Sequence, residues 1–190
     1  IFIIGAGGSA ISMGSYLMRD EFAGNYPGRI IVSNRSQTRL AEIEKIFRTL
    51  NKGKVGELQF HLCPEHEQND AVLSSIRPFS LIINATGLGK DRPGSPITDA
   101  AQFPDNSLVW EINYRGSLKF MQQALNQKVA SNLIVEDGWT YFIHGWTQVI
   151  AEVFHTPIEG SLLRKLDEVA RHMRRPYSTD TSSYMRKSEY

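Results

Sequence analysis

The sequence has one cysteine, Cys63, among its 190 residues, so no disulfide bond can form within the chain. It has no apolar run near the roughly 20 residues that a membrane span needs, and the apolar residues 1–4 lack the basic flank of a signal peptide. The charges nearly cancel, with 21 lysines and arginines against 20 aspartates and glutamates. We therefore expect a cytoplasmic protein with neither nucleic acid nor a membrane as its partner.

Side chains that bind metals or form hydrolytic sites are also scarce. The five histidines are scattered along the chain without the spacing typical of a zinc site, so we expect no bound metal. No serine lies in the sharp strand-to-helix turn that presents a catalytic nucleophile. Cys63 ends a short apolar run, and we expect it to be a buried structural thiol.

What the sequence does have is a regular alternation of short apolar runs and amphipathic stretches. The apolar runs predict six strands, at residues 1–4, 29–33, 58–62, 81–84, 108–112 and 133–135. The amphipathic stretches predict helices at residues 9–22, 38–50, 67–76, 118–128, 141–154 and 161–173. This order predicts an α/β, Rossmann-type, doubly wound parallel sheet of about six strands with helices on both faces.

The length fits one domain, which we place at residues 1–175. Its last two helices would close the domain, and the second carries an apolar stripe formed by Leu162, Leu166, Val169 and Met173. Residues 176–190 are mostly polar, so we expect them to form a mobile tail.

A glycine-rich turn follows the first strand and matches the pattern G-x-G-x-x-A. Its residues are Gly5, Ala6, Gly7, Gly8, Ser9 and Ala10. The first glycine permits the tight turn, the second lets the backbone approach a pyrophosphate, and the final alanine keeps the helix close to the sheet. The N–H groups at the start of that helix would face the phosphates. The alternative is an ordinary strand-to-helix turn without a ligand.

The end of the second strand indicates which dinucleotide would bind. NAD sites usually carry an acidic residue here that accepts from the ribose 2′-hydroxyl, but this strand is followed by Asn34, Arg35 and Ser36, with Arg39 one turn later. Two guanidinium groups and a hydroxyl would hold a 2′-phosphate, which favours NADP. The alternative is that both arginines are ordinary surface residues and Ser36 only caps the next helix.

Four motifs together resemble the NADP-binding half of the shikimate dehydrogenases, including their quinate-using relatives. They are the glycine loop, Asn34-Arg35-Ser36-x-x-Arg39, Ile83-Asn84-Ala85-Thr86-Gly87 and Asp137-Gly138, and they cover about residues 1–160. The resemblance implies an oxidoreductase of aromatic amino acid biosynthesis. It would transfer hydride between NADP and a ring hydroxyl or ketone of a small carboxylated carbocycle.

The resemblance also implies roles for individual residues. The glycine loop would hold the pyrophosphate, and Asn34, Arg35, Ser36 and Arg39 would hold the 2′-phosphate. Asn84, Ala85 and Thr86 would pass beside the nicotinamide ribose, and Gly138 would offer its carbonyl to the nicotinamide amide. The family's Asp-x-x-Tyr corresponds to the run from Glu111 to Tyr114, which would place Tyr114 near the nicotinamide and the substrate carboxylate.

Departures from the family pattern fall on the substrate side. The family follows Asp-Gly with Met-Leu and then a Gln that touches substrate, whereas this chain has Tyr141-Phe142 and then Gly145 at the Gln position. Gln148 would replace that Gln only if the helix shifted by one turn. The family's Pro-x-x-Thr is also altered, because Arg115 directly follows Tyr114. These changes leave the prediction of NADP binding in place, and they leave the substrate open among shikimate, quinate and their relatives.

In this family the catalytic Lys and Asp come from an N-terminal substrate domain, which would precede Ile1. We therefore expect no catalytic residue in this chain, and that substrate domain as its partner. Two weaker candidates for an acid or base are Lys90, beside Asp91 in a loop expected to be exposed and mobile, and His144, near Tyr114 in the expected site.

Two other functions stay open at this point. One is a non-catalytic regulatory module that binds NADP and needs no Lys–Asp pair. The other is the NADP domain of a different two-domain dehydrogenase, such as a relative of methylene-tetrahydrofolate dehydrogenase, because a shared fold does not fix the reaction. A homodimer also stays open.

Overall fold

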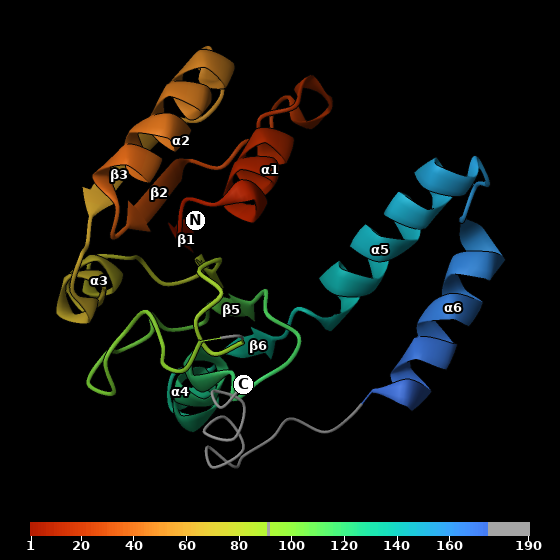
Figure 1. Cartoon of the computed structure of the whole chain (residues 1–190). Helices are drawn as coiled ribbons and strands as arrows, with labels where there is room; N and C mark the ends of the chain where they lie inside the picture. The colour runs from red at the N-terminus through yellow and green to blue at the C-terminus, as the bar shows by residue number, and fades with distance from the viewer. Residues whose placement is uncertain (91, 175–190) are drawn as a thin grey trace, which may run out of the picture.

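The structure is a computed structural model that describes residues 1–90 and 92–174. Its centre is a six-stranded parallel sheet with the order β3-β2-β1-β4-β5-β6 (Figure 1). The strands are β1 Phe2–Ile4, β2 Arg29–Asn34, β3 Glu57–Leu62, β4 Leu81–Asn84, β5 Leu108–Glu111 and β6 Ile134–Glu136. The chain builds outward from β1 to one edge and then from β4 to the other, which confirms the predicted doubly wound fold. The expected tail at 176–190 lies outside the described residues.

The helices follow the predicted stretches with small shifts at their ends. They are α1 Gly8–Leu17, α2 Gln37–Asn51, α3 His66–Ser74, α4 Lys119–Gln127, α5 Trp139–Phe154 and α6 Gly160–Met173. The largest difference is in α1, which was expected to continue to residue 22. Met18 ends it and is buried, and Arg19 adopts an extended backbone, so the chain turns there into a short 3-10 helix, η1 Asp20–Phe22.

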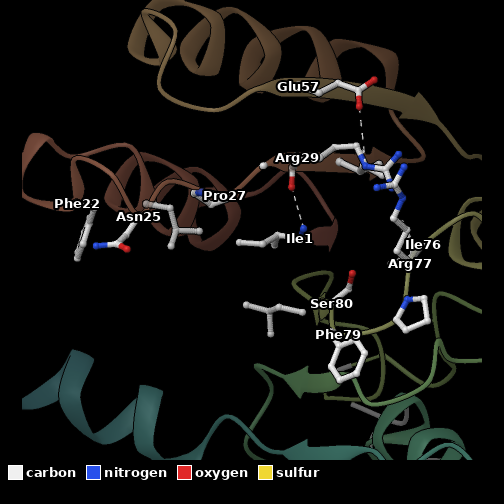
Figure 2. A pocket seen from close by; sticks show the side chains of 15 residues that line it. Ile1, Phe22, Asn25, Pro27, Arg29, Glu57, Ile76, Arg77, Phe79 and Ser80 are labelled. Atoms are coloured by element: carbon white, nitrogen blue, oxygen red, sulfur yellow. Dashed lines mark hydrogen bonds and ion pairs between the residues drawn. The ribbon is translucent and has the colours of Figure 1, made fainter.

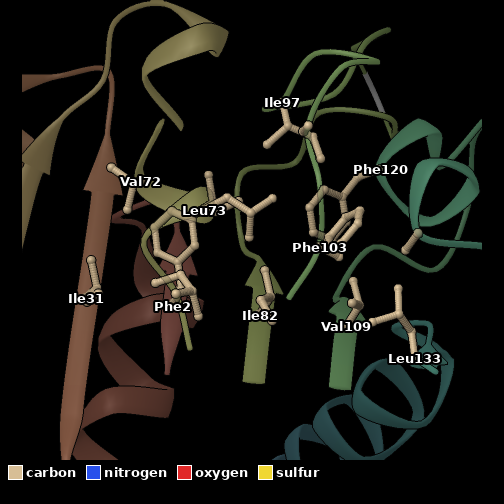
Figure 3. Packing of buried hydrophobic residues seen from close by; sticks show 14 of the residues in the cluster. Phe2, Ile31, Val72, Leu73, Ile82, Ile97, Phe103, Val109, Phe120 and Leu133 are labelled. Carbon is tan, nitrogen blue, oxygen red and sulfur yellow. The ribbon is translucent and has the colours of Figure 1, made fainter. Parts of the chain in front are cut away.

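Side chains of the four inner strands, β1, β2, β4 and β5, alternate between two cores, one on each face of the sheet. In β1, Phe2 and Ile4 belong to the core that α3 and α4 cover, whereas Ile3 belongs to the core that α1 and α2 cover. Figure 3 shows the first of these cores, where Phe103 and Phe120 meet edge to face at 5.5 Å between ring centroids. Because both faces are covered at the centre of the sheet, β1 and β4 are almost continuously apolar, whereas the edge strands β3 and β6 are only partly buried and carry polar residues.

The last two helices form a hairpin beside the sheet (Figure 1). In α5 only Ile143 and Thr147 are buried, and α6 buries none of its residues. The predicted stripe on α6 exists, but Leu162, Leu166, Val169 and Met173 are 37–78% exposed, so these helices do not close the domain as expected. No helix in the described part of the chain is long and apolar enough to cross a membrane.

Candidate cofactor-binding site

The glycine loop lies where the sheet changes direction, at the carboxyl ends of β1 and β4. Gly5 has a φ of +113°, and a Cβ at this position would lie 2.7 Å from the carbonyl oxygen of Ala85. Its N–H donates to Ser33 O at 2.8 Å, and the N–H of Ala85 donates to Ile4 O at 2.8 Å. The turn is thus fixed against the ends of both neighbouring strands, and only glycine fits at its first position.

The rest of the loop is open toward solvent. Gly7 and Gly8 are exposed, and a Cβ on either would meet nothing within 4 Å. Gly7 is the N-cap of α1 and provides no side-chain cap, so the first N–H groups of α1 point into this open space. A helix N-terminus with exposed N–H groups and no obstructing side chain suits an anion, so the loop fits the pyrophosphate predicted for it.

The residues after β2 lie at the same edge of the sheet. Asn34 donates to Ser36 O at 3.2 Å, and the Ser36 hydroxyl accepts from Arg39 N at 3.5 Å. The capping role considered for Ser36 is therefore confirmed. Arg35 and Arg39 are both exposed, and Arg39 pairs with Glu42 of the same helix at 3.3 Å. Residues 34–39 contain no acid that would repel a 2′-phosphate from Arg35.

On the other side of the glycine loop, the ends of β4 and β5 share a buried polar cluster. We call it the carboxylate–amide cluster, and it consists of Asn84, Glu111 and Asn113. Asn84 Nδ2 donates to Glu111 Oε2 at 2.7 Å, and both the backbone N–H and Nδ2 of Asn113 donate to Glu111 Oε1 at 2.9 and 2.6 Å. Asn84 Oδ1 in turn accepts from the Thr86 hydroxyl at 2.7 Å. The buried Asn84 side chain therefore connects the end of β5 to the loop that follows β4.

Glu111 has an unusual electrostatic environment. Its burial raises the pKa from about 4.5 to about 7, the hydrogen bonds from Asn113 and Asn84 oppose this shift, and the charge of Asp137 adds to it. Glu111 is the acceptor in all three hydrogen bonds, which suits an ionised carboxylate. The sequence pointed to this position only as the acid of an Asp-x-x-Tyr-like run.

The loop after β4 is held more tightly than the sequence indicated. Asn113 Nδ2 donates to Leu88 O at 3.1 Å, and Leu118 N donates to Gly89 O at 3.1 Å. Gly89 is buried and Lys90 is half-buried, so the expectation of an exposed loop is wrong for these two residues. Two backbones meet here, because a Cβ on Gly116 would lie 2.2 Å from Gly89 O. Asp91 lies outside the described residues.

Tyr114 lies in an aromatic and cationic environment. Its ring stacks on Phe142 with centroids 3.8 Å apart and an interplanar angle of 17°. Lys90 Nζ and Arg115 Cζ lie over the same ring, 5.4 and 5.6 Å from its centroid. The structure thus brings together Tyr114 and Lys90, which the sequence had placed in one region.

The roles predicted for the other two residues on α5 stay predictions. Gln148 is exposed and donates to Glu152 at 3.1 Å on the same helix, and His144 is also exposed. The side chain that contacts Tyr114 from α5 is Phe142. Sequence reasoning named Phe142 only as a departure from the family pattern, because stacking between distant residues leaves no local signal.

The start of α5 is fixed by a close backbone contact. Gly138 is its N-cap, the N–H of Gly138 donates to Asn113 O at 3.1 Å, and a Cβ there would lie 1.9 Å from Ile112 O. Asp137 Oδ1 accepts from Trp139 N at 2.8 Å, and its carbonyl accepts from Trp110 Nε1 at 3.1 Å. The contact between Gly138 and a nicotinamide stays a prediction.

A pocket of about 730 Å³ lies at the opposite end of the strands, near their amino ends (Figure 2). It is lined by residues around the starts of β1, β2 and β4, among them Ile1, Arg29 and Phe79. The backbone nitrogen of Ile1 donates to Arg29 O at 2.8 Å, and Arg29 pairs with Glu57 at 4.0 Å. Because open α/β sheets bind ligands at the carboxyl ends of their strands, this pocket is separate from the cofactor site.

Comparisons with known proteins agree with this geometry. No protein-family model matches the chain. The chain is 30% identical over 115 residues to shikimate dehydrogenase (NADP(+)) from Streptococcus thermophilus, a match that covers 60% of this chain and 37% of that protein.

Solved structures show the same fold. Shikimate 5-dehydrogenase from Listeria monocytogenes, in complex with shikimate and NAD, matches 89% of this chain and 54% of its own, with a TM-score of 0.63 and 17% identity. Shikimate 5-dehydrogenase from Thermus thermophilus, in complex with shikimate, matches 90% of this chain and 53% of its own, with a TM-score of 0.57 and 21% identity. A 5-ketofructose reductase from a Gluconobacter strain matches with a TM-score of 0.52 and 17% identity.

The chain spans about half the length of these solved neighbours and 37% of the curated relative. The predicted resemblance is confirmed in sequence by the match to a shikimate dehydrogenase, and the solved structures confirm the predicted fold.

Proposed function

We propose that this chain is the NADP-binding domain of a shikimate dehydrogenase-like oxidoreductase. The observation that carries the proposal is the acid-free end of β2, where Arg35 and Arg39 are exposed beside an open glycine loop. Guanidinium groups bind phosphate through paired, charge-assisted hydrogen bonds, so they would favour the 2′-phosphate of NADP over the 2′-hydroxyl of NAD.

The chain's own residues divide the work of binding. The N–H groups of Gly8 and Ser9 at the start of α1 would hold the pyrophosphate, and Arg35 would hold the 2′-phosphate, with Ser36 fixing the start of α2. Bound NADP supplies the acceptor for a hydride. Tyr114 would border the substrate, which we propose to be a small carboxylated carbocycle such as shikimate or quinate.

We place the acid–base pair outside this chain, on a substrate domain. Two features support this. Glu111 already accepts hydrogen bonds from three donors and is completely buried. The solved neighbours are about twice as long as the matched region, which leaves room in them for a second domain.

The proposal is tested by replacing Arg35 with alanine and measuring NADP and NAD binding by titration calorimetry. We expect Arg35→Ala to weaken NADP binding about tenfold or more, because a charge-assisted pair is lost, and to leave NAD binding unchanged. Arg48→Ala is the matched control, since Arg48 is exposed on α2, the helix that follows Arg35, and pairs with Glu44. An Arg35→Ala variant that binds NADP as tightly as the unmodified chain would refute the assignment of the 2′-phosphate site.

A further inference from the structure

One side-chain contact joins the first turn of α5 to the first turn of α1. The Tyr141 hydroxyl donates to Ser9 Oγ at 3.1 Å, although the two residues are 132 positions apart in the chain. Ser9 belongs to the glycine loop, and Tyr141 stands where the family has an apolar methionine. A polar group has therefore been introduced at the edge of the proposed cofactor site.

Rigid parts of the fold hold Tyr141 in place. Its ring meets Trp110 of β5 edge to face, with centroids 5.9 Å apart and an interplanar angle of 87°. Trp110 is itself anchored, because its Nε1 donates to Asp137 O at 3.1 Å just before α5 begins. The position of the hydroxyl is thus set by β5 and by the turn into α5.

The pair of hydroxyls is accessible and faces the anion-binding end of α1. The Tyr141 side chain remains 37% exposed, and Ser9 follows the two open glycines Gly7 and Gly8. A phosphate oxygen bound at this helix end could accept from both hydroxyls, since each carries one donor that rotates to suit its partner. Hydrogen bonds to a charged acceptor are also stronger than the neutral contact seen here.

We propose that Tyr141 is a further cofactor-binding residue, whose hydroxyl acts together with Ser9 to hold the pyrophosphate of the dinucleotide from the α5 side. The inference rests on the proposed function and adds to it a contact from outside the glycine loop. It also links the cofactor to α5, which has few other buried contacts with the sheet. Binding of the pyrophosphate then adds a contact to the first turns of α5, beyond the backbone contact that holds Gly138, whereas binding of the adenosine end alone does not.

The test is Tyr141→Phe, which removes the hydroxyl and keeps the ring against Trp110. Two ligands are titrated by calorimetry and two-dimensional NMR. One is NADP, and the other is adenosine 2′-monophosphate, which has the 2′-phosphate but no pyrophosphate. We expect Tyr141→Phe to weaken NADP binding about fivefold or more, as for a lost hydrogen bond to a charged group, and to leave binding of adenosine 2′-monophosphate unchanged. Tyr16→Phe is the matched control, because Tyr16 is 52% exposed on α1 and packs against Phe22.

The possible results separate this inference from the proposed function. If the unmodified chain binds neither ligand, the proposed function fails and the inference fails with it. If the unmodified chain binds NADP and the Tyr141→Phe variant binds NADP equally well or more tightly, only the inference is overturned. Tighter binding by the variant would mean that the hydroxyl obstructs the site. A Ser9→Ala variant completes a double-mutant cycle, in which we expect the loss from both changes to be smaller than the sum of the two single losses.

Hydrogen exchange gives a second readout that does not depend on affinity. We expect NADP to slow amide exchange in the first two turns of α5 in the unmodified chain and to do so much less in Tyr141→Phe. Equal slowing in both proteins would contradict the link between the pyrophosphate and α5.

Discussion

The two halves of the sheet's carboxyl edge are built in different ways. Around the glycine loop and the end of β2, the ligand-facing groups are backbone N–H groups and exposed side chains, and the space above Gly7 and Gly8 is open. Around the ends of β4 and β5, Asn84 and Glu111 are fully buried, and their side-chain oxygens all accept hydrogen bonds from within the protein. We call these the nucleotide half and the network half.

This difference shows which groups each half depends on. Backbone groups bind a pyrophosphate whatever side chains surround them, so the nucleotide half needs only a few glycines and a cationic group. The network half depends on the fit of specific buried side chains, and a half-satisfied polar network is costly. Of the departures from the family pattern, Arg115 and Phe142 lie against Tyr114 beside the network half, whereas Tyr141 reaches Ser9 of the nucleotide half.

The largest effect is expected from Gly5→Ala, which would break the turn that joins both halves. The new Cβ would lie 2.7 Å from Ala85 O, at a φ of +113°, so we expect a loss of about 3 kcal/mol in the free energy of unfolding. Gly24→Ala is the matched control, because Gly24 also has a positive φ but has open space around it, and about 1 kcal/mol is expected there. Urea denaturation measures both, and equal losses would show that the close approach to Ala85 is unimportant.

Glu111→Gln would test the network half through its pH dependence. Because the pKa of Glu111 is raised from about 4.5 to about 7, the folded state binds more protons than the unfolded state between these values. The contribution of Glu111 to the free energy of unfolding therefore falls as pH rises from 4.5 to 7, by on the order of 3 kcal/mol. Outside that window its contribution is constant.

We expect the Glu111→Gln variant to show a flatter profile in that window, as measured by urea denaturation at several pH values. It should also be less stable than the unmodified chain at pH 8, where its amide would oppose the donor of Asn84. Glu168→Gln, at an exposed position on α6, should reproduce the profile of the unmodified chain. A steep slope that persists in Glu111→Gln would assign the titration to another group.

The smallest effect is expected from Phe142→Ala, which removes the stacking partner of Tyr114. Phe142 is only partly buried, so we expect about 1–2 kcal/mol of lost stability by thermal or urea unfolding. NADP affinity should change by less than about twofold, because the nucleotide half does not use this ring. Phe154→Ala on the same helix, where Phe154 is 71% exposed, should cost less than about 0.5 kcal/mol. A large loss of NADP affinity in Phe142→Ala would show that the two halves are not separable.

The fold was predictable because buried parallel strands are nearly continuous apolar runs. Residues 81–84 were predicted to the residue, and the other five strands within one residue at each end. The glycine loop and the residues after β2 were also predictable, since their function depends on local sequence. Helix α1 ended early because burial of Met18 redirected the chain, and such tertiary effects override local preference.

Contacts between distant segments were not predictable in the same way. The pairing of Tyr141 with Ser9 and the stacking of Tyr114 on Phe142 join residues from separate elements. The packing of Gly89 against Gly116 likewise depends on how two loops meet. For Glu111 a signal did exist, because it takes the acidic position of the Asp-x-x-Tyr-like run, and a charged residue at the end of a buried strand indicates a satisfied polar network.

The most direct test of the NADP assignment is the ratio of NADP to NAD affinity of the unmodified chain, measured by titration calorimetry at one salt concentration. Because Arg35 and Arg39 flank the end of β2 and no acid follows that strand, we expect NADP to bind about tenfold or more tightly than NAD. Equal affinities, or tighter binding of NAD, would contradict the central claim that this edge of the sheet is an NADP site.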